Sequence, residues 1–154
     1  MKLLLHYTSK GRCDWADTAA SDYTKRLNRY APFEEQKNKP ASGKSRDQAQ
    51  LKEAEGLLGK IGQRDRLIVL DERGSSLSSH DLADLIENSA MDATNRLIFS
   101  IGGSYGHHPT MRAHAYKCIK LSEMVLNHQV ARVLLLEQLY RAWTILKNEP
   151  YHHA

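Results

Sequence analysis

The 154-residue sequence has only two cysteines, Cys13 and Cys118, and no long apolar run. A membrane-spanning helix needs about 20 consecutive apolar residues, whereas the longest strictly aliphatic run here covers residues 133–136. Residues 1–5 resemble the start of a signal peptide, but His6, Lys10 and Arg12 interrupt the apolar segment and no small-residue cleavage site follows. The cysteines lack metal-ligand spacing and an export context, so we expect free thiols. These absences predict a cytoplasmic protein without a membrane segment.

Several common active-site motifs are also missing. The chain contains neither a P-loop nor a G-x-S-x-G nucleophile motif. The glycines of residues 102–106 do not fit the dinucleotide-binding pattern G-x-G-x-x-G. The histidine pairs at residues 107–108 and 152–153 are adjacent in sequence, so neither pair converges well on one metal ion, and we expect no metal site.

Length and charge set further limits. A chain of 154 residues predicts one domain, residues 1–154, with a single core. The formal net charge is +4, and eight histidines can add to it near a polyanion. This surplus is a mild indication of nucleic-acid affinity.

Hydrophobic spacing predicts strands that alternate with helices. We expect strands at residues 2–7, 33–39, 66–70, 97–101 and 116–121, and the polar second strand suits a sheet edge. Helices are expected at residues 14–30, 45–62, 78 onward, 109–115 and 127–147, with Asp14, a Ser45–Gln48 capping box and a Ser78–Asp81 pair at three of their starts. Residues 71–74 are expected to form a turn. This alternation predicts an α/β fold, a mainly parallel sheet flanked by helices.

The last predicted helix has almost no polar face. Its apolar residues include Val130, Leu134, Leu139 and Trp143, which point in different directions around the helix. A helix that is apolar on nearly all sides must be buried on more than one side. We therefore expect the sheet to cover one side and a second copy of the chain to cover another, forming a homodimer.

The glycine-rich segment of residues 98–106 is the strongest indication of a ligand site. A short apolar run, expected to be a buried strand, ends on Gly102 and Gly103. Glycines allow backbone amides to approach a ligand closely, and ligands of α/β proteins bind at the carboxyl ends of strands. The segment could also be a simple tight turn. Together with the ends of the strands at Leu70 and Leu121, it could hold a heteroaromatic ring and a ribose.

Five sequence blocks resemble, in order, the signature of the RlmH family, which are small SPOUT-class methyltransferases of large-subunit ribosomal RNA. The blocks are residues 70–74, 101–106, 121–133, 137–142 and 149–153. The resemblance covers nearly the whole chain. It implies a SPOUT-type fold with a C-terminal trefoil knot from Gly102 onward, a homodimer, and S-adenosyl-L-methionine as methyl donor. It further implies methylation of N3 of a pseudouridine in 23S rRNA within the assembled ribosome.

The resemblance also assigns site residues. It places the cofactor against Leu70, Gly102, Gly103, Leu121, Ser122, Glu123, Met124, Val125 and Leu126. The candidates for the methyl-transfer step are His128, Arg132, Arg141, Tyr151, His152 and His153. Two positions depart from the family pattern: Asn127 replaces a usual proline, and Glu123 stands where lysine is common.

Elementary chemistry gives these candidates roles. An activated methyl donor mainly requires that the nucleophile be aligned and water excluded. The three histidines titrate in the range useful for removing the N3 proton, and Tyr151 could orient the base. Arg132 and Arg141 could stabilise charge on the uracil carbonyls, although Arg141 could equally pair with Glu137 one helical turn away. The candidates for contacts with RNA phosphates are Arg12, Lys25, Arg26, Arg29, Lys44 and Arg46.

Two other functions fit parts of the pattern. A non-catalytic dimeric protein that binds nucleotides or RNA could use the same fold. A dinucleotide-dependent oxidoreductase is a weaker alternative because its fingerprint is broken.

Overall fold

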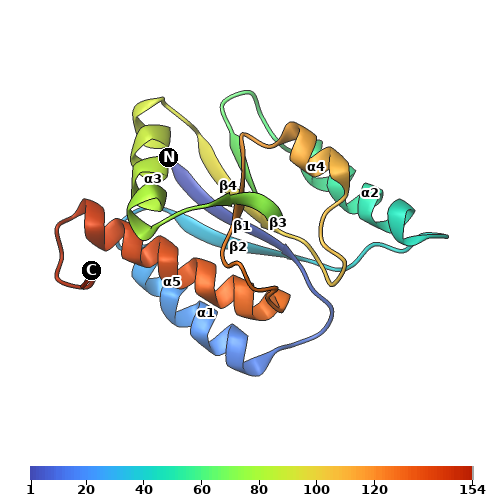
Figure 1. Cartoon of the computed structure of the whole chain (residues 1–154), viewed down its shortest axis with the longest axis horizontal. Coiled ribbons are helices and arrows are strands. Elements are labelled where there is room, and N and C mark those ends of the chain that lie inside the picture. Colours follow the sequence, from blue (N-terminus) through green and yellow to red (C-terminus); the bar gives the residue numbers. More distant parts are fainter. Residues whose placement is uncertain (154) are drawn as a thin grey trace.

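The computed structural model describes residues 1–153 and contains one five-stranded, wholly parallel sheet, ordered β2-β1-β4-β3-β5. The strong α/β alternation of the sequence is therefore confirmed (Figure 1). The polar strand β2 lies at one edge of the sheet, as expected. The elements in chain order are β1 Lys2–Thr8, α1 Asp14–Leu27, β2 Phe33–Asn38, α2 Arg46–Leu58, β3 Arg66–Ser76, α3 Ser79–Met91, β4 Arg96–Ile101, α4 Pro109–His114, β5 Lys117–Lys120 and α5 His128–Leu146.

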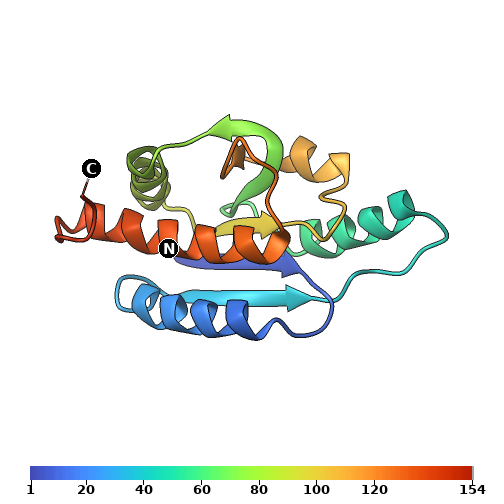
Figure 2. The same ribbon diagram turned by 60° about the horizontal axis from the view of Figure 1, so that its bottom comes forward.

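Helices cover both faces of the sheet. Side chains alternate along a strand, so Leu3 and Leu5 of β1 face a core shared with α1, α3 and α5, while Leu4 faces a smaller core under α2 and α4. Figures 1 and 2 show α5 beside α1, and α2 beside α4. The sheet is thus buried on both sides, which is typical of parallel sheets.

The turn expected at residues 71–74 is wrong, because β3 continues to Ser76. Leu70 and Ser75 both lie opposite Ile119 of β5, so the residues between them bulge out of the ladder. A Cβ atom on Gly74 would lie 2.6 Å from the backbone of Ile119. Glycine is therefore required at position 74 so that β3 and β5 can approach closely. In the sequence, such a glycine looks the same as one that marks a turn.

The predicted helix starts are partly confirmed. Ser78 and Asp81 form a full capping box on α3. Ser45 accepts from the backbone of Gln48, but the Gln48 side chain accepts from Lys44 N–H and not from Ser45. Cys13, not Asp14, is the N-cap of α1, and its N–H donates to the Asp17 carboxylate.

Helix α5 lies between α1 and α3 and contributes the centre of the larger core. Leu135, Leu136 and Leu139 are completely buried. The outer side of the helix is half-covered within one chain, with Val133 and Leu134 of intermediate exposure and Val130 40% exposed. The sheet thus covers one side as expected, and the contact with a second copy stays a prediction.

The chain crosses the carboxyl ends of the strands twice after β4. It first passes to α4 on one face, then returns through β5 and residues 121–127 to α5 on the other face (Figure 2). This path follows the order expected for the C-terminal segment, while the trefoil knot itself stays a prediction. No helix in the described part of the chain is long and apolar enough to cross a membrane.

Candidate active site

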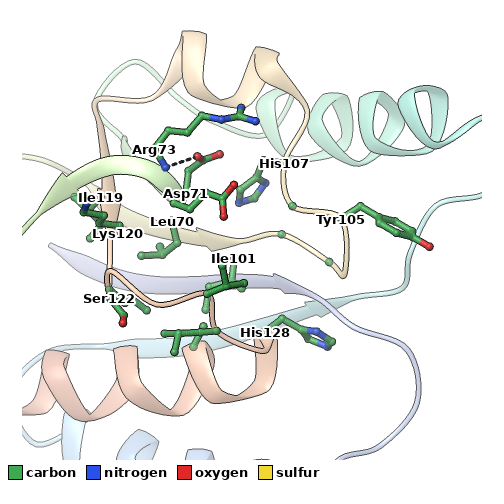
Figure 3. A pocket seen from close by; sticks show the side chains of 18 of the residues that line it. Leu70, Asp71, Arg73, Ile101, Tyr105, His107, Ile119, Lys120, Ser122 and His128 are labelled. Carbon is green, nitrogen blue, oxygen red and sulfur yellow. Dashed lines mark hydrogen bonds between the residues drawn. The ribbon is translucent and has the colours of Figure 1, made fainter.

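A cavity of about 370 Å³ lies where β4 and β5 end, beside the bulge of β3. We call it the main pocket; Figure 3 shows the strand-end loops that surround it. Its volume is in the range of small-molecule and cofactor sites, about 300–1,000 Å³. The lining residues are Leu70–Arg73, Ile101–His107, Arg112, Ile119–Ser122, Met124–Leu126, His128 and Ala131.

The glycine segment forms a compact loop at the edge of the main pocket. Gly106 N–H donates to the Gly103 carbonyl at 3.0 Å, and Gly106 has φ of +76°, a conformation that favours glycine. A Cβ on Gly102 would lie 2.6 Å from the carbonyl carbon of Gly106. A Cβ on Gly103 would instead make an ordinary 3.5 Å contact with Thr8. Gly102 is therefore the position at which this loop requires glycine most strictly.

Helix α2 fixes the same loop from outside. Gln50 Nε2 donates to the carbonyls of Tyr105 and Gly106, at 2.9 and 3.1 Å. The Arg46 guanidinium lies 3.7 Å from the centroid of the Tyr105 ring. Figure 3 shows Tyr105 pointing away from the other lining side chains. The backbone of the glycine loop is thus held in place before any ligand binds.

Two polar groups of the main pocket were not foreseen. Asp71 accepts from the backbone of Arg73 at 2.9 Å and from Arg112 at 3.2 Å, and its side chain is only 9% exposed. His107 Nε2 donates to the Ser100 carbonyl at 3.0 Å, which leaves Nδ1 of the neutral ring as an acceptor. Burial lowers the pKa of His107. The sequence signal that could have indicated both residues is their position, since Asp71 and His107 come shortly after the apolar runs that end at residues 70 and 101.

Most of the expected cofactor residues line the main pocket. These are Leu70, Gly102, Gly103, Leu121, Ser122, Met124, Val125 and Leu126. Glu123 does not, because it pairs with Lys120 at 2.8 Å and accepts from Ser76 at 3.2 Å. Met124 and Val125 are 79% and 85% exposed, so their side chains are available at the mouth of the pocket.

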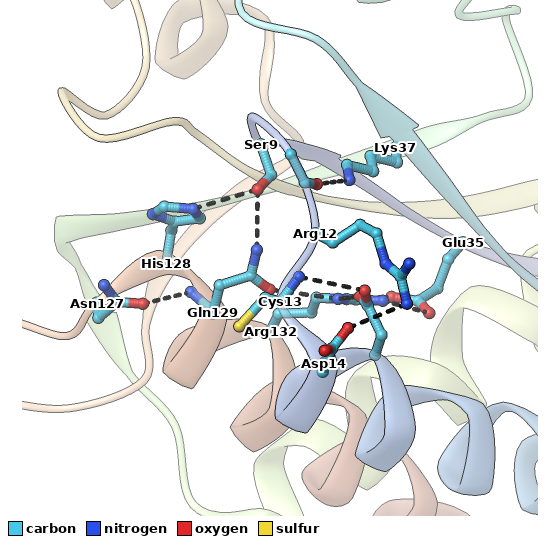
Figure 4. A network of polar contacts seen from close by, with 12 residues as sticks. Ser9, Arg12, Cys13, Asp14, Glu35, Lys37, Asn127, His128, Gln129 and Arg132 are labelled. Atoms are coloured by element: carbon cyan, nitrogen blue, oxygen red, sulfur yellow. Dashed lines mark hydrogen bonds and ion pairs between the residues drawn. The ribbon is translucent and has the colours of Figure 1, made fainter.

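His128 borders the main pocket at the start of α5. Its Nε2 lies 3.4 Å from Ser9 Oγ, which also accepts from Gln129 at 2.8 Å (Figure 4). Asn127 Oδ1 accepts from Gln129 N–H at 2.8 Å and so caps the helix. The asparagine at the usual proline position therefore fixes the helix start through a hydrogen bond.

Arg132 lies away from the main pocket, in the same polar network (Figure 4). It is 4% exposed and pairs with Glu35 and Asp17, each at 2.7 Å. Burial alone would lower the pKa of Arg132, but its hydrogen bonds to Glu35 and Asp17 outweigh burial and raise it. A direct contact with substrate would require this buried network to break.

The remaining candidates lie at the other end of α5. Arg141 pairs with Glu137, so the simple helical pair is present. Tyr151 donates to Glu137 at 3.2 Å and packs edge-on against Tyr140. His152 Nδ1 lies 3.4 Å from Arg141, and His153 is exposed. Because the 19 residues of α5 span about 28 Å, this tail lies far from the main pocket of its own chain.

The described residues contain no group of three or more His, Cys, Asp or Glu side chains that could hold a metal ion.

Comparisons with known proteins identify the family of the chain. The family model described as "Predicted SPOUT methyltransferase" matches residues 1–152. The solved structure described as "a probable methylase family protein from Haemophilus influenzae Rd KW20" has a TM-score of 0.54 and 12% identity over 99% of this chain and 70% of that one. At this identity the likeness concerns the fold alone. The fold and family match define the class as a SPOUT methyltransferase.

Two bacterial relatives narrow the class. The protein named Ribosomal RNA large subunit methyltransferase H from Geobacter sp. (strain M21) is 40% identical over 99% of both chains. The protein of the same name from Geotalea uraniireducens (strain Rf4) is 40% identical over 99% of this chain and all of its own. The chain belongs to the ribosomal RNA large subunit methyltransferase H family, as its five sequence blocks predicted.

Proposed function

We propose that this protein transfers a methyl group from S-adenosyl-L-methionine to N3 of a pseudouridine in 23S rRNA of the assembled ribosome, in the cytoplasm. The observation that carries the proposal is the main pocket, where the glycine loop, the bulge of β3 and the end of β5 meet in a chain of this family. The names of the relatives support ribosomal RNA as the substrate class. The particular base and atom rest on the resemblance of the sequence blocks.

The residues of the main pocket fit the proposed donor. The loop leaves no room for a Cβ at Gly102, so backbone groups instead of side chains line this edge. Leu70, Leu121 and Leu126 supply apolar surface suited to a purine ring. Backbone amides at strand ends and Asp71 supply hydrogen bonds for polar substituents such as a ribose. Bound here, the donor supplies an electrophilic methyl group.

The residues of the chain have three tasks in the proposed reaction. The loops hold and orient the reactants, which is worth several kcal/mol as an entropic effect. Met124 and Val125 can cover the mouth and exclude water, since both are exposed beside the pocket. His128, which borders the pocket and contacts Ser9, is our candidate for accepting the N3 proton, directly or through water.

We infer a homodimer in which the tail of one chain serves the main pocket of its partner. The half-covered outer side of α5 supports the contact, as do two buried nitrogens, Trp143 Nε1 and His152 Nε2, that find no acceptor among residues 1–153. A buried polar group generally requires a partner. The separation between the tail and the main pocket of the same chain supports the proposal that each tail serves the partner's pocket.

The proposal is tested by incubating the protein with labelled S-adenosyl-L-methionine and ribosomes from a strain that lacks this modification. We expect one labelled nucleotide, found by nuclease digestion and mass spectrometry, and much less label on free 23S rRNA. Family membership does not favour the non-catalytic alternative. That alternative predicts ribosome binding without transfer of label, and such a result would reject the proposal.

A further inference from the structure

A second cavity, of about 180 Å³, shares no lining residue with the main pocket. It lies between α2 and the carboxyl ends of β1 and β2, and we call it the α2 cavity. Strand residues line one side and helix residues the other. The lining consists of His6, Thr8, Gln36, Asn38, Lys39, Ala41, Lys52, Glu53, Gly56, Leu57 and Lys60.

The rim of the α2 cavity is positively charged. Three exposed lysines border it, Lys39, Lys52 and Lys60, against a single carboxylate, Glu53. Hydrogen bonds fix two of these groups at the rim: Glu53 Oε1 accepts from Ala41 N–H at 2.9 Å, and Lys52 Nζ donates to the Ser42 carbonyl at 2.9 Å. A surplus of ammonium groups around a concave surface attracts phosphate.

The interior of the α2 cavity offers unused hydrogen-bonding groups. His6 is only 7% exposed, and its Nδ1 lies 3.3 Å from Ser100 Oγ. Within residues 1–153, neither His6 Nε2 nor the Gln36 side chain has a hydrogen-bond partner, although both residues border the cavity. Burial, together with the charges of His107 and Lys60, lowers the pKa of His6 to about 4. The ring is therefore neutral at physiological pH, and because Nδ1 is engaged by Ser100, it offers the cavity one group, Nε2, which donates or accepts according to the tautomer.

The size and position of the α2 cavity restrict its ligand. Its volume is about half that of the main pocket, which leaves too little room for a second large cofactor. Ser100 joins the two sites, since its hydroxyl contacts His6 and its carbonyl accepts from His107 of the main pocket. A ligand in the α2 cavity is therefore placed next to the site where the target base reacts.

We propose that the α2 cavity binds one unpaired nucleotide of the RNA substrate, with its phosphate at the lysine rim and its base edge at His6 and Gln36. This inference rests on the proposed function, since the second nucleotide would fix the register of the target base. Unpaired nucleotides are the expected partners because only splayed-out bases expose their hydrogen-bonding edges to protein. A free nucleoside monophosphate has the same chemistry, so the experiment must distinguish the two sources.

Gly56 of α2 permits a clean test, because a Cβ built there meets no atom within 4 Å. We expect Gly56→Leu to fill part of the α2 cavity while the helix is retained, since leucine favours helices more than glycine does. Gly56→Ala is the matched control, which improves the helix but leaves most of the space. In methyl transfer to ribosomes, KM for ribosomes should rise about tenfold or more for Gly56→Leu and less than about twofold for Gly56→Ala. Both variants should bind S-adenosylhomocysteine normally by calorimetry. Equal KM values for the two variants would overturn the proposal.

A binding experiment separates this proposal from the proposed function. Backbone amide NMR spectra of the whole protein are recorded with uridine or adenosine monophosphate, uridine and inorganic phosphate. We expect the nucleotides to shift signals near His6 and Gln36 more than uridine or phosphate does, in wild type and Gly56→Ala but not in Gly56→Leu. Equal shifts by phosphate alone, with an unchanged KM for ribosomes, would identify a free-anion site and overturn the RNA assignment. A wild-type protein that shows these shifts but transfers no methyl group would instead refute the proposed function.

Discussion

At the scale of single residues, Gly102 has the least room of the glycines in the main pocket. Its missing Cβ would lie 2.6 Å from Gly106, whereas at Gly103 the nearest atom would be 3.5 Å away, on Thr8. We predict that Gly102→Ala distorts the loop and weakens S-adenosylmethionine binding at least tenfold, about 1.4 kcal/mol. Gly103→Ala should change the affinity much less. Calorimetric titration of both variants checks the prediction, and equal affinities would show that the loop does not contact the donor.

His6 gives a prediction about pH. Its pKa is lowered to about 4 in the folded protein from an ordinary 6.5, so the unfolded chain binds a proton that the folded chain refuses between these values. The contribution of His6 to the free energy of unfolding should therefore be fully present above pH 6.5 and be lost as the pH decreases towards 4. The full shift corresponds to about 3 kcal/mol. Urea unfolding at pH 7 and pH 5 should show a smaller loss for His6→Gln than for wild type; the same loss in both would exclude His6 as the cause.

At the scale of elements, the network around Arg132 joins α5 to α1 and β2. Breaking a buried ion pair from one side costs about 3–5 kcal/mol, and the partly exposed Asp17 favours the lower value. We predict that Arg132→Met lowers the free energy of unfolding by about 3 kcal/mol.

The matched control for Arg132 is Arg26→Met, which removes a surface pair with Asp22 and should cost less than about 1 kcal/mol. Denaturant unfolding of both variants provides the measurement. If Arg132→Met keeps normal stability yet transfers no methyl group, Arg132 has the direct catalytic role that the sequence suggested.

The sequence predicted most of the strands and helices, while the roles of the site residues stay predictions. Hydrophobic patterns with strand or helix spacing reflect which residues are buried. In β1, β4 and α5 the buried apolar residues show these patterns, so the sequence predicts these elements. The extension of β3 was missed because Gly74 is needed for an approach by β5, which is distant in the sequence. The ion pairs of Arg132 were missed for the same reason. Its partners Asp17 and Glu35 are distant in the sequence, so the sequence alone suggested a substrate contact. The loops of the main pocket were predictable because parallel strands end at one edge.

At the scale of the whole molecule, the tail and the main pocket lie at opposite ends of α5. If the tail serves the partner, two defective chains can restore one active site. We predict that Gly102→Ala and a chain ending at Pro150 are each nearly inactive. After unfolding and refolding together in equal amounts, the mixture should regain roughly a quarter of wild-type activity, because half of the dimers are mixed and each has one intact site.

The matched control mixes two chains that both carry Gly102→Ala, which should regain nothing. Sedimentation must show that both variants form dimers, and calorimetry should show that the chain ending at Pro150 binds S-adenosylmethionine within a fewfold of wild type. Dimers of both variants without any recovery on mixing would place the action of the tail within its own chain.

The position of α5 also affects the synthesis of the protein. The helix that fills the centre of the larger core, through Leu135, Leu136 and Leu139, follows in the sequence every strand and helix that it packs against. Chains are made from the N-terminus, so one face of the sheet has no cover between α1 and α3 until α5 has been synthesised. Until then each nascent chain exposes an incomplete, aggregation-prone core. Chaperones that bind apolar surface should therefore engage the nascent chain until α5 has emerged and packed.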